Sequence, residues 1–134
     1  MKYNGVIESK LRTIEDKLAQ IESWKVESYT VFAESSLLQN GVERALQVAV
    51  EVMIDISERI LALENQPPKN SSAESLEALG ALGIIQDPNK YTAMIRFRNF
   101  IVHRYEKVDT EIVYDILSTK LDLFRDFIRE IRSA

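Results

Sequence analysis

One short stretch of the sequence holds most of the side chains that could carry chemistry. Residues 96–107, RFRNFIVHRYEK, contain four Lys or Arg side chains, one acid and the only histidine of a chain whose net charge is −4. Positive charge is therefore concentrated in one place, as a binding site for phosphodiesters requires. A solvated helix face would also account for a cluster of this size, so charge alone leaves both interpretations open.

Two side chains in this stretch have the chemistry for cleaving RNA without a metal ion. The reaction needs a group with a pKa near neutrality to move the proton of the 2′-hydroxyl or of the leaving group. It also needs a fixed cation to stabilise the charge on the phosphorane. His103 is the natural proton-transfer group, and Arg98, permanently ionised and able to bind phosphate through two N–H groups, is the natural cation.

The spacing of these residues is compatible with one site but is not decisive. At about 100° per residue, Asn99 and His103 share a helix face, and so do Arg98 and Tyr105. Arg98 and His103 themselves lie about 140° apart around an ideal helix. They can converge if the helix ends near His103, if the long Arg98 side chain wraps around it, or if two subunits each contribute one copy.

The composition excludes several other kinds of site. The chain has no Cys and one His, which excludes a disulfide framework, a thiolate nucleophile and Cys-ligated metals, and argues against a His-rich metal centre. We therefore expect no metal and no cofactor. The N-terminus lacks the apolar segment of a signal peptide, and no apolar run is long enough to span a membrane. These features predict a cytoplasmic protein without membrane contact.

The elements that must position these side chains are predicted to be helices. The chain of 134 residues contains only four Gly and three Pro, and its length suits a single domain over residues 1–134. A first helix over about 5–24 is predicted by an apolar stripe with helical spacing, made of Ile7, Leu11, Ile14, Leu18 and Ile21. The pattern over 28–40 is weaker, and Gln39-Asn40-Gly41 predicts a bend or break before a second helix that runs to about residue 64.

Signals for helix ends divide the remainder of the chain. Pro67-Pro68 marks a loop, and the capping-box spacing of residues 71–74 begins a short helix. Asp87-Pro88 predicts that the helix carrying the basic stretch begins at about 88. Asp109 or Thr110 can cap one last helix that continues to the C-terminal region. We expect an all-α fold of about five helices in an antiparallel bundle.

The pattern Arg98-Asn99-x-x-x-His103-x-Tyr105 resembles the Arg-x4-His-x-Tyr signature of the HepT-like branch of HEPN-domain toxins. The resemblance covers essentially all 134 residues. Outside the motif it is carried by the segments 43–47, 54–56, 72–85 and 113–114.

The resemblance implies a function, a partner and an assembly. It implies the toxin of a type II or type VII-like toxin–antitoxin pair, a metal-independent ribonuclease in which Arg98 and His103 are the catalytic pair and Asn99 helps to shape the site. It implies a homodimer formed partly through residues 98–105, with the motifs of two subunits lining one cleft. It also implies a minimal nucleotidyltransferase as antitoxin, which attaches AMP to Tyr105 and so places phosphates in the anion site.

Other roles stay open for several of these residues. Arg96, Arg104 and Lys107 are expected to hold RNA phosphates, although one or two could be ordinary surface charges. His103 could be a core histidine bonded to a carbonyl, Asn99 a helix-end residue, and Tyr105 a rim residue. Arg98 could instead pair with an acid such as Asp55, although an intrahelical Asp55–Arg59 pair is the preferred interpretation for that acid.

A function of another class also stays open. The chain could be a non-catalytic helical binding module that docks a nucleotidyltransferase or binds nucleotide, presenting Tyr105. The intact pair of Arg98 and His103 favours the nuclease, because a docking module has no chemical need for both. A structural helical dimer without ligand would leave the basic cluster unexplained.

Overall fold

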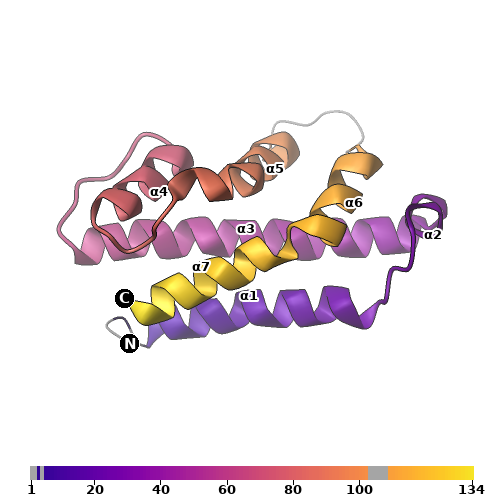
Figure 1. Ribbon diagram of the computed structural model, residues 1–134, viewed down its shortest axis with the longest axis horizontal. Helices are drawn as coiled ribbons and strands as arrows, with labels where there is room; N and C mark the ends of the chain where they lie inside the picture. Colours follow the sequence, from indigo (N-terminus) through magenta and orange to yellow (C-terminus); the bar gives the residue numbers. More distant parts are fainter. Residues whose placement is uncertain (1–2, 4, 103–108) are drawn as a thin grey trace.

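The computed structural model describes residues 3, 5–102 and 109–134, and the architecture of this part is all-helical (Figure 1). Its elements are α1 (Val6–Ser23), α2 (Tyr29–Glu34), α3 (Ser36–Leu63), α4 (Ser72–Ala81), the 3-10 helix η1 (Pro88–Tyr91), α5 (Thr92–Val102), α6 (Thr110–Thr119) and α7 (Leu121–Ser133). The predicted all-α class is confirmed. The predicted number of about five helices is wrong, because the described residues form seven α-helices.

The long helix α3 is the centre of the arrangement. It packs against α1, α2, α4, α5 and α6. Figure 1 shows α1 running antiparallel to α3 on one side, with α4 and α5 on the other side. The breadth of this contact explains why the apolar residues of α3 cover more than one face of the helix. None of the described helices is both long enough and apolar enough to cross a membrane.

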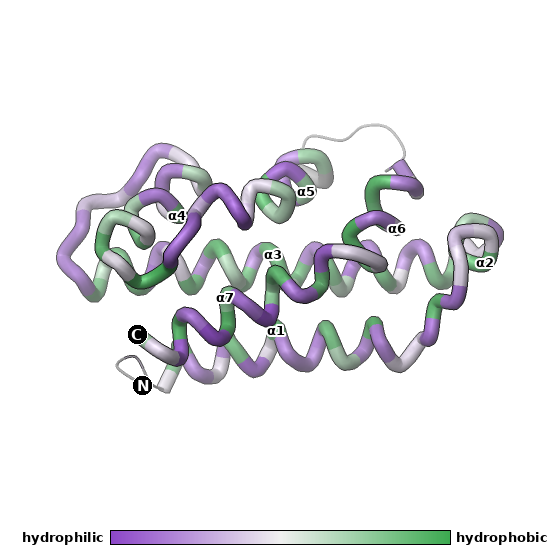
Figure 2. Tube along the Cα trace, viewed as in Figure 1, coloured by the Kyte–Doolittle hydropathy of each residue, from purple (hydrophilic) through white to green (hydrophobic). Residues whose placement is uncertain are grey.

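The first predicted helix is confirmed as α1. The apolar stripe is buried in the core, at Ile7, Leu11, Ile14, Leu18 and Ile21. Burying a side chain of this size stabilises the fold by roughly 1.5–3 kcal/mol. Polar residues alternate with the stripe along α1, and the same alternation is clear along α7 (Figure 2). Both helices therefore have one face in the core and one in solvent.

The predicted break at Gln39-Asn40-Gly41 is wrong, since α3 passes through these residues without interruption. A methyl group added at Gly41 would lie 3.0 Å from the Trp24 ring, so the glycine provides room for the ring to pack against α3. The real break lies earlier, at Ser35, whose hydroxyl caps α3 by accepting a hydrogen bond from the N–H of Leu38 at 3.1 Å. A separate short helix, α2, precedes it.

The segment that leads into the basic stretch is built from α4, η1 and α5. Ser71 caps α4 by accepting from the N–H of Glu74 at 3.1 Å, which confirms the predicted start of this helix. The start predicted at about 88 is confirmed in position, but its first turn is the 3-10 helix η1. Gly80 and Pro88 are packed so closely that a methyl group added at Gly80 would lie 2.4 Å from the Pro88 Cγ. This contact sets α4 directly against the turn from which α5 begins.

The last predicted helix is divided in two. Asp109 caps α6 as predicted, accepting from the N–H of Glu111 at 2.8 Å. The helix stops before Lys120, whose backbone has φ −122° and ψ 3°. The hydroxyls of Ser118 and Thr119 both donate to main-chain carbonyls one turn back, at 2.7 Å, a bonding pattern that often bends helices. As a result α6 packs on α2 and α3, while α7 turns to lie along α1.

Candidate functional site

Arg98, the predicted catalytic cation, lies where α5 packs against α3. Its Nε–H donates to Oε1 of Glu51, on α3, at 3.3 Å. Its Nη1 donates to the side-chain oxygen of the neighbouring Asn99, also at 3.3 Å. The Arg98 side chain is about one-third exposed, at 32%. The guanidinium is thus held from two directions while part of it still faces solvent.

These two bonds leave the guanidinium able to bind an anion. An arginine has five N–H donors, and Glu51 and Asn99 use two of them. Charge-assisted hydrogen bonds are commonly about 2.7–2.9 Å long, so the 3.3 Å contact with Glu51 is a loose one. Among the described residues, Arg98 is therefore oriented without all its donors being used, which is the condition for a cation that must bind a phosphate.

A hollow of about 350 Å³ opens beside Arg98. We call it the Arg98 hollow, and it is lined by Glu58, Lys69, Asn70, Ser71, Ser72, Ala73, Ile95, Arg98 and Asn99. Three elements meet here: the C-terminal half of α3, the loop and first turn of α4, and the exposed side of α5. Most of the lining side chains are polar, so this hollow suits a polar ligand.

Arg96, a predicted phosphate-binding residue, lies on another side of α5. It lines a smaller hollow of about 70 Å³ between α4 and η1. Two positions along a helix correspond to a turn of about 200°, which separates Arg96 from Arg98. Ala73 and Ile95 line both hollows and form the boundary between them. The structure therefore does not bring Arg96 into the Arg98 hollow.

The alternative that Arg98 pairs with an acid is confirmed, but the acid is Glu51 and not Asp55. Asp55 instead contacts Lys10 of α1 at 2.6 Å and Arg59, one turn along α3, at 3.1 Å. Partial burial works against the charged form of Asp55, but hydrogen bonds from Lys10 and Arg59 prevail and lower the pKa of this carboxyl. The predicted Asp55–Arg59 pair is confirmed, and Glu51 is the acid that meets Arg98.

The remaining predicted site residues lie outside the described residues. These are His103, Arg104, Tyr105 and Lys107. The geometry of Arg98 relative to His103 therefore stays a prediction, as does the position of Tyr105. What the structure describes is the Arg98 half of the motif, carried on α5 up to Val102.

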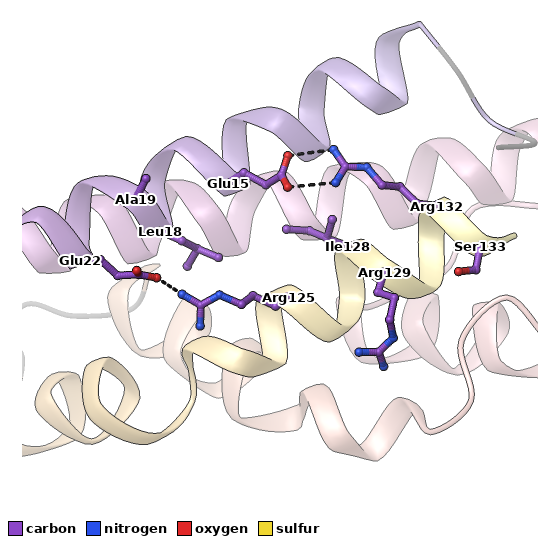
Figure 3. Close-up of a pocket in the computed structure, with 9 residues that line it drawn as sticks. All are labelled: Glu15, Leu18, Ala19, Glu22, Arg125, Ile128, Arg129, Arg132 and Ser133. Carbon is purple, nitrogen blue, oxygen red and sulfur yellow. Dashed lines mark hydrogen bonds and ion pairs between the residues drawn. The ribbon is translucent and has the colours of Figure 1, made fainter.

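A second hollow, of about 560 Å³, lies between α1 and α7 but is a poor anion site (Figure 3). Its cations are already neutralised: Arg132 forms ion pairs with Glu8 at 2.7 Å and Glu15 at 2.8 Å, and Arg125 pairs with Glu22. Hydrogen bonds from Arg132 lower the pKa of both Glu8 and Glu15, and the same contacts raise the pKa of Arg132. An incoming anion would have to displace these carboxylates.

Sequence reasoning missed two residues of the site, Glu51 and Lys69. Glu51 lies one helical turn before Asp55, on a polar row of α3, but nothing local relates it to Arg98, which is 47 positions away along the chain. Lys69 is a single lysine in a Pro-containing loop. Only the packing of α3, α4 and α5 places both near Arg98, so neither had a signal in the sequence.

Comparison with known proteins gives consistent matches over nearly the whole chain. A family model described as "Ribonuclease HepT-like" matches residues 14–131. The mRNA nuclease HepT of Shewanella oneidensis is 27% identical over 132 residues, covering 97% of this chain and 98% of the relative. The tRNA nuclease HepT of Aphanizomenon flos-aquae is 26% identical over 133 residues, covering 96% of this chain and 88% of the relative.

A solved structure agrees with the fold as well. A tri-AMPylated HEPN toxin of Shewanella oneidensis, in complex with an MNT antitoxin, matches this chain with a TM-score of 0.88 and 26% identity. The match covers 98% of this chain and 100% of the solved one. The helical arrangement of Figure 1 is therefore shared with that toxin over its full length.

Proposed function

This chain belongs to the HepT-like ribonuclease family, and from that membership we propose that it is a metal-independent endoribonuclease and the toxin of a toxin–antitoxin pair. The observation that carries the proposal is the state of Arg98. At the arginine position of the motif, α5 presents a guanidinium beside a polar hollow; Glu51 and Asn99 orient it, and its other donors have no hydrogen bond to any described residue. Two relatives named as nucleases support the reaction class.

The proposed reaction uses the 2′-hydroxyl of the RNA as nucleophile. His103 accepts the proton of this hydroxyl while its oxygen attacks the adjacent phosphorus. Arg98 stabilises the charge that develops on the phosphorane oxygens. The bond from phosphorus to the 5′-oxygen then breaks, and the 5′-oxygen takes up the proton from a histidine imidazolium. The products are a 2′,3′-cyclic phosphate and a 5′-hydroxyl.

The proposed active unit is a homodimer. Arg98 and His103 are about 140° apart on an ideal helix, so a single straight helix does not direct both toward one phosphate. Two copies of the motif facing one another across a dimer axis would allow an arginine and a histidine from different subunits to act together. A closed two-fold arrangement of this kind is the commonest form of homo-oligomer.

The proposed partner is a nucleotidyltransferase antitoxin that transfers AMP to Tyr105. Its support is the similar toxin described as tri-AMPylated and in complex with an MNT antitoxin. Each added AMP brings a phosphate with negative charge and strong acceptor oxygens. Placed near Arg98, this phosphate would compete with RNA for the same donors, so modification would block the site directly.

The deciding experiment is RNA cleavage in EDTA with mapping of the product ends. Freshly purified protein is first weighed by mass spectrometry, because AMP-modified protein would be inactive. Wild type is expected to leave 2′,3′-cyclic phosphate ends, whereas Arg98→Ala and His103→Ala lose cleavage by about 100-fold or more. Unmodified wild type that cuts no RNA, but still binds a nucleotidyltransferase, would instead establish the non-catalytic binding module.

A further inference from the structure

The cations of this protein differ in whether a carboxylate already neutralises them. The three arginines of α7, Arg125, Arg129 and Arg132, are paired, and so are Lys10 and Arg12 on α1. Within the described part of the chain, Lys69 makes no ion pair and no hydrogen bond. Four further cations, Lys17, Lys25, Arg44 and Arg96, also lack an ion pair there, but none of them lines the Arg98 hollow. Of the two cations that line this hollow, Arg98 pairs with Glu51, whereas Lys69 forms no ion pair with a described residue.

The Arg98 hollow has the size and lining of a site for a small polar ligand. Its volume of about 350 Å³ lies at the lower end of the roughly 300–1,000 Å³ usual for small-molecule sites. The side chains of Asn70 and Ser72 line it and make no hydrogen bond to other described residues. They supply both donors and acceptors. Ile95, which is buried, gives the hollow an apolar floor.

One carboxylate limits which ligand fits. Glu58 lines the same hollow and forms no ion pair with any described residue. A free, multiply charged anion in the hollow would be attracted by Lys69 and Arg98 but repelled by the Glu58 carboxylate. A nucleotide, which has one negative phosphate and a neutral sugar and base, can direct its phosphate to Lys69 and its neutral part toward Glu58. The lining therefore favours a nucleotide over a free inorganic anion.

We propose that the Arg98 hollow binds one nucleotide of single-stranded RNA adjacent to the scissile phosphate, with Lys69 holding the phosphate of that nucleotide. This inference rests on the proposed ribonuclease function, and it adds a substrate-binding residue to it. Arg98 would then contact the reacting phosphate, and Lys69, on the loop before α4, would fix the neighbouring one. Lys69 acts in binding and takes no part in proton transfer.

The test measures binding separately from cleavage. The probe is a short single-stranded oligonucleotide with 2′-fluoro sugars, which lacks the attacking hydroxyl. Its dissociation constant is measured by fluorescence anisotropy over a series of KCl concentrations, using unmodified full-length protein. Each phosphate that a protein neutralises on a single strand contributes about 0.7 to the slope of log K against log salt. The variants are Lys69→Ala, Glu58→Gln and Lys17→Ala, the last being the matched control on α1.

Three results are expected together. Lys69→Ala weakens binding several-fold at low salt and reduces the salt slope by about 0.7. Glu58→Gln strengthens binding, because it removes a negative charge from the hollow. Lys17→Ala changes neither quantity. Since Lys69 has no ion pair or hydrogen bond to lose among the described residues, the unfolding temperature of Lys69→Ala should be close to that of wild type, so weak binding cannot be attributed to misfolding.

The outcomes separate this inference from the proposed function. Equal behaviour of Lys69→Ala and Lys17→Ala, with RNA cleavage by the wild type intact, would overturn the nucleotide site and leave the nuclease standing. The expected binding differences in a protein that cuts no RNA would overturn the nuclease and leave the nucleotide site standing. A wild type that does not bind the oligonucleotide would overturn the site as well.

Discussion

The Nε–H of Arg98 donates to Oε1 of Glu51 over 3.3 Å, and this bond joins α5 to α3 at the edge of the Arg98 hollow. The Nη end of the guanidinium has one hydrogen bond to a described residue, from Nη1 to the side-chain oxygen of Asn99. An acid on the central helix therefore determines how the proposed catalytic cation is presented. The bond also connects the proposed site to the core of the fold, because α3 contacts most of the other helices.

Arg98→Lys tests whether the shape of the guanidinium matters as well as its charge. Lysine keeps the charge but lacks the planar fork that contacts Glu51 and Asn99 and binds phosphate through two donors. We expect kcat for RNA cleavage to fall by roughly 100-fold, with a folded protein of unchanged thermal stability. Activity within a few-fold of wild type would show that a point charge suffices and would contradict the proposed role of the fork.

Glu51 variants test its role in positioning Arg98. Glu51→Ala removes the acceptor for the Nε–H, so Arg98 samples more orientations. We expect kcat to fall roughly tenfold with little change in KM. Glu51→Gln retains an oxygen at the same position and should preserve most of the activity. An equal loss in the alanine and glutamine variants would show that the negative charge of Glu51, and not its acceptor oxygen, is what matters.

Tyr105→Phe tests the proposed site of modification. Incubated with its nucleotidyltransferase partner and ATP, the wild type should gain the mass of AMP and lose RNA cleavage. The phenylalanine variant has no hydroxyl to accept AMP, so its mass should not change. Intact-mass spectrometry before and after incubation decides the matter. A gain in mass by Tyr105→Phe would place the modification on another residue.

Gly80→Ala tests the close packing of α4 on η1. The added methyl group would lie 2.4 Å from the Pro88 Cγ, so one of the two segments must move. Overpacking of this kind costs about 1–3 kcal/mol, which outweighs the gain of about 1 kcal/mol from replacing glycine in a helix. Urea unfolding should show a lower midpoint, while the exposed Glu77→Ala on the same helix stays within about 0.5 kcal/mol of wild type.

The ion pairs of Arg132 predict that the protein loses folding stability at acid pH. Hydrogen bonds from Arg132 lower the pKa of Glu8 and Glu15 below that of the unfolded chain, which is about 4.3. Their contribution is therefore complete above about pH 4.3 and is lost as the pH falls through the lower folded values. Wild type should lose more stability than Arg132→Gln between pH 7 and pH 3.

Urea midpoints measured at both pH values provide the check on this pH dependence. Other carboxyls with lowered pKa values, including Asp55 and Asp126, are the same in wild type and in Arg132→Gln, so they cancel in the comparison. If wild type and Arg132→Gln lose the same stability between pH 7 and pH 3, the ion pairs of Arg132 do not contribute to the loss of stability in acid.

The parts of the fold that depend on local sequence were predictable. The stripe of α1 faces one side of the core, so its period alone identifies the helix. Ser71 and Asp109 cap helices through hydrogen bonds to residues two or three positions away. Both partners of each bond therefore lie within one short sequence motif, which is why these helix starts could be predicted. The division between α6 and α7 was not predictable in this way, because the apolar positions continue across Lys120 and the bend follows from hydroxyl bonds that compete with the helix.

The candidate site was predictable only in part, for the same physical reason. Arg98 could be chosen from its residue type and its spacing to His103. Its orientation could not, because it depends on Glu51, which approaches only when α5 packs on α3. Lys69 is placed by the loop between α3 and α4 and has no neighbour in sequence that marks it. The orientation of Arg98 and the position of Lys69 both depend on contacts between elements that are far apart in the sequence.

The ion pairs between α1 and α7 also determine how a polyanion would approach the molecule. On that side, each positive charge of Arg125 and Arg132 is cancelled within a few ångströms, so the electric field falls off quickly with distance. Lys69 has no such partner in the part of the chain that the structure describes, so its field extends into the solvent near α5. RNA diffusing toward this chain would therefore be attracted more strongly to the flank that carries Lys69 than to the face between α1 and α7. Added salt would slow this encounter before it disturbed the fold.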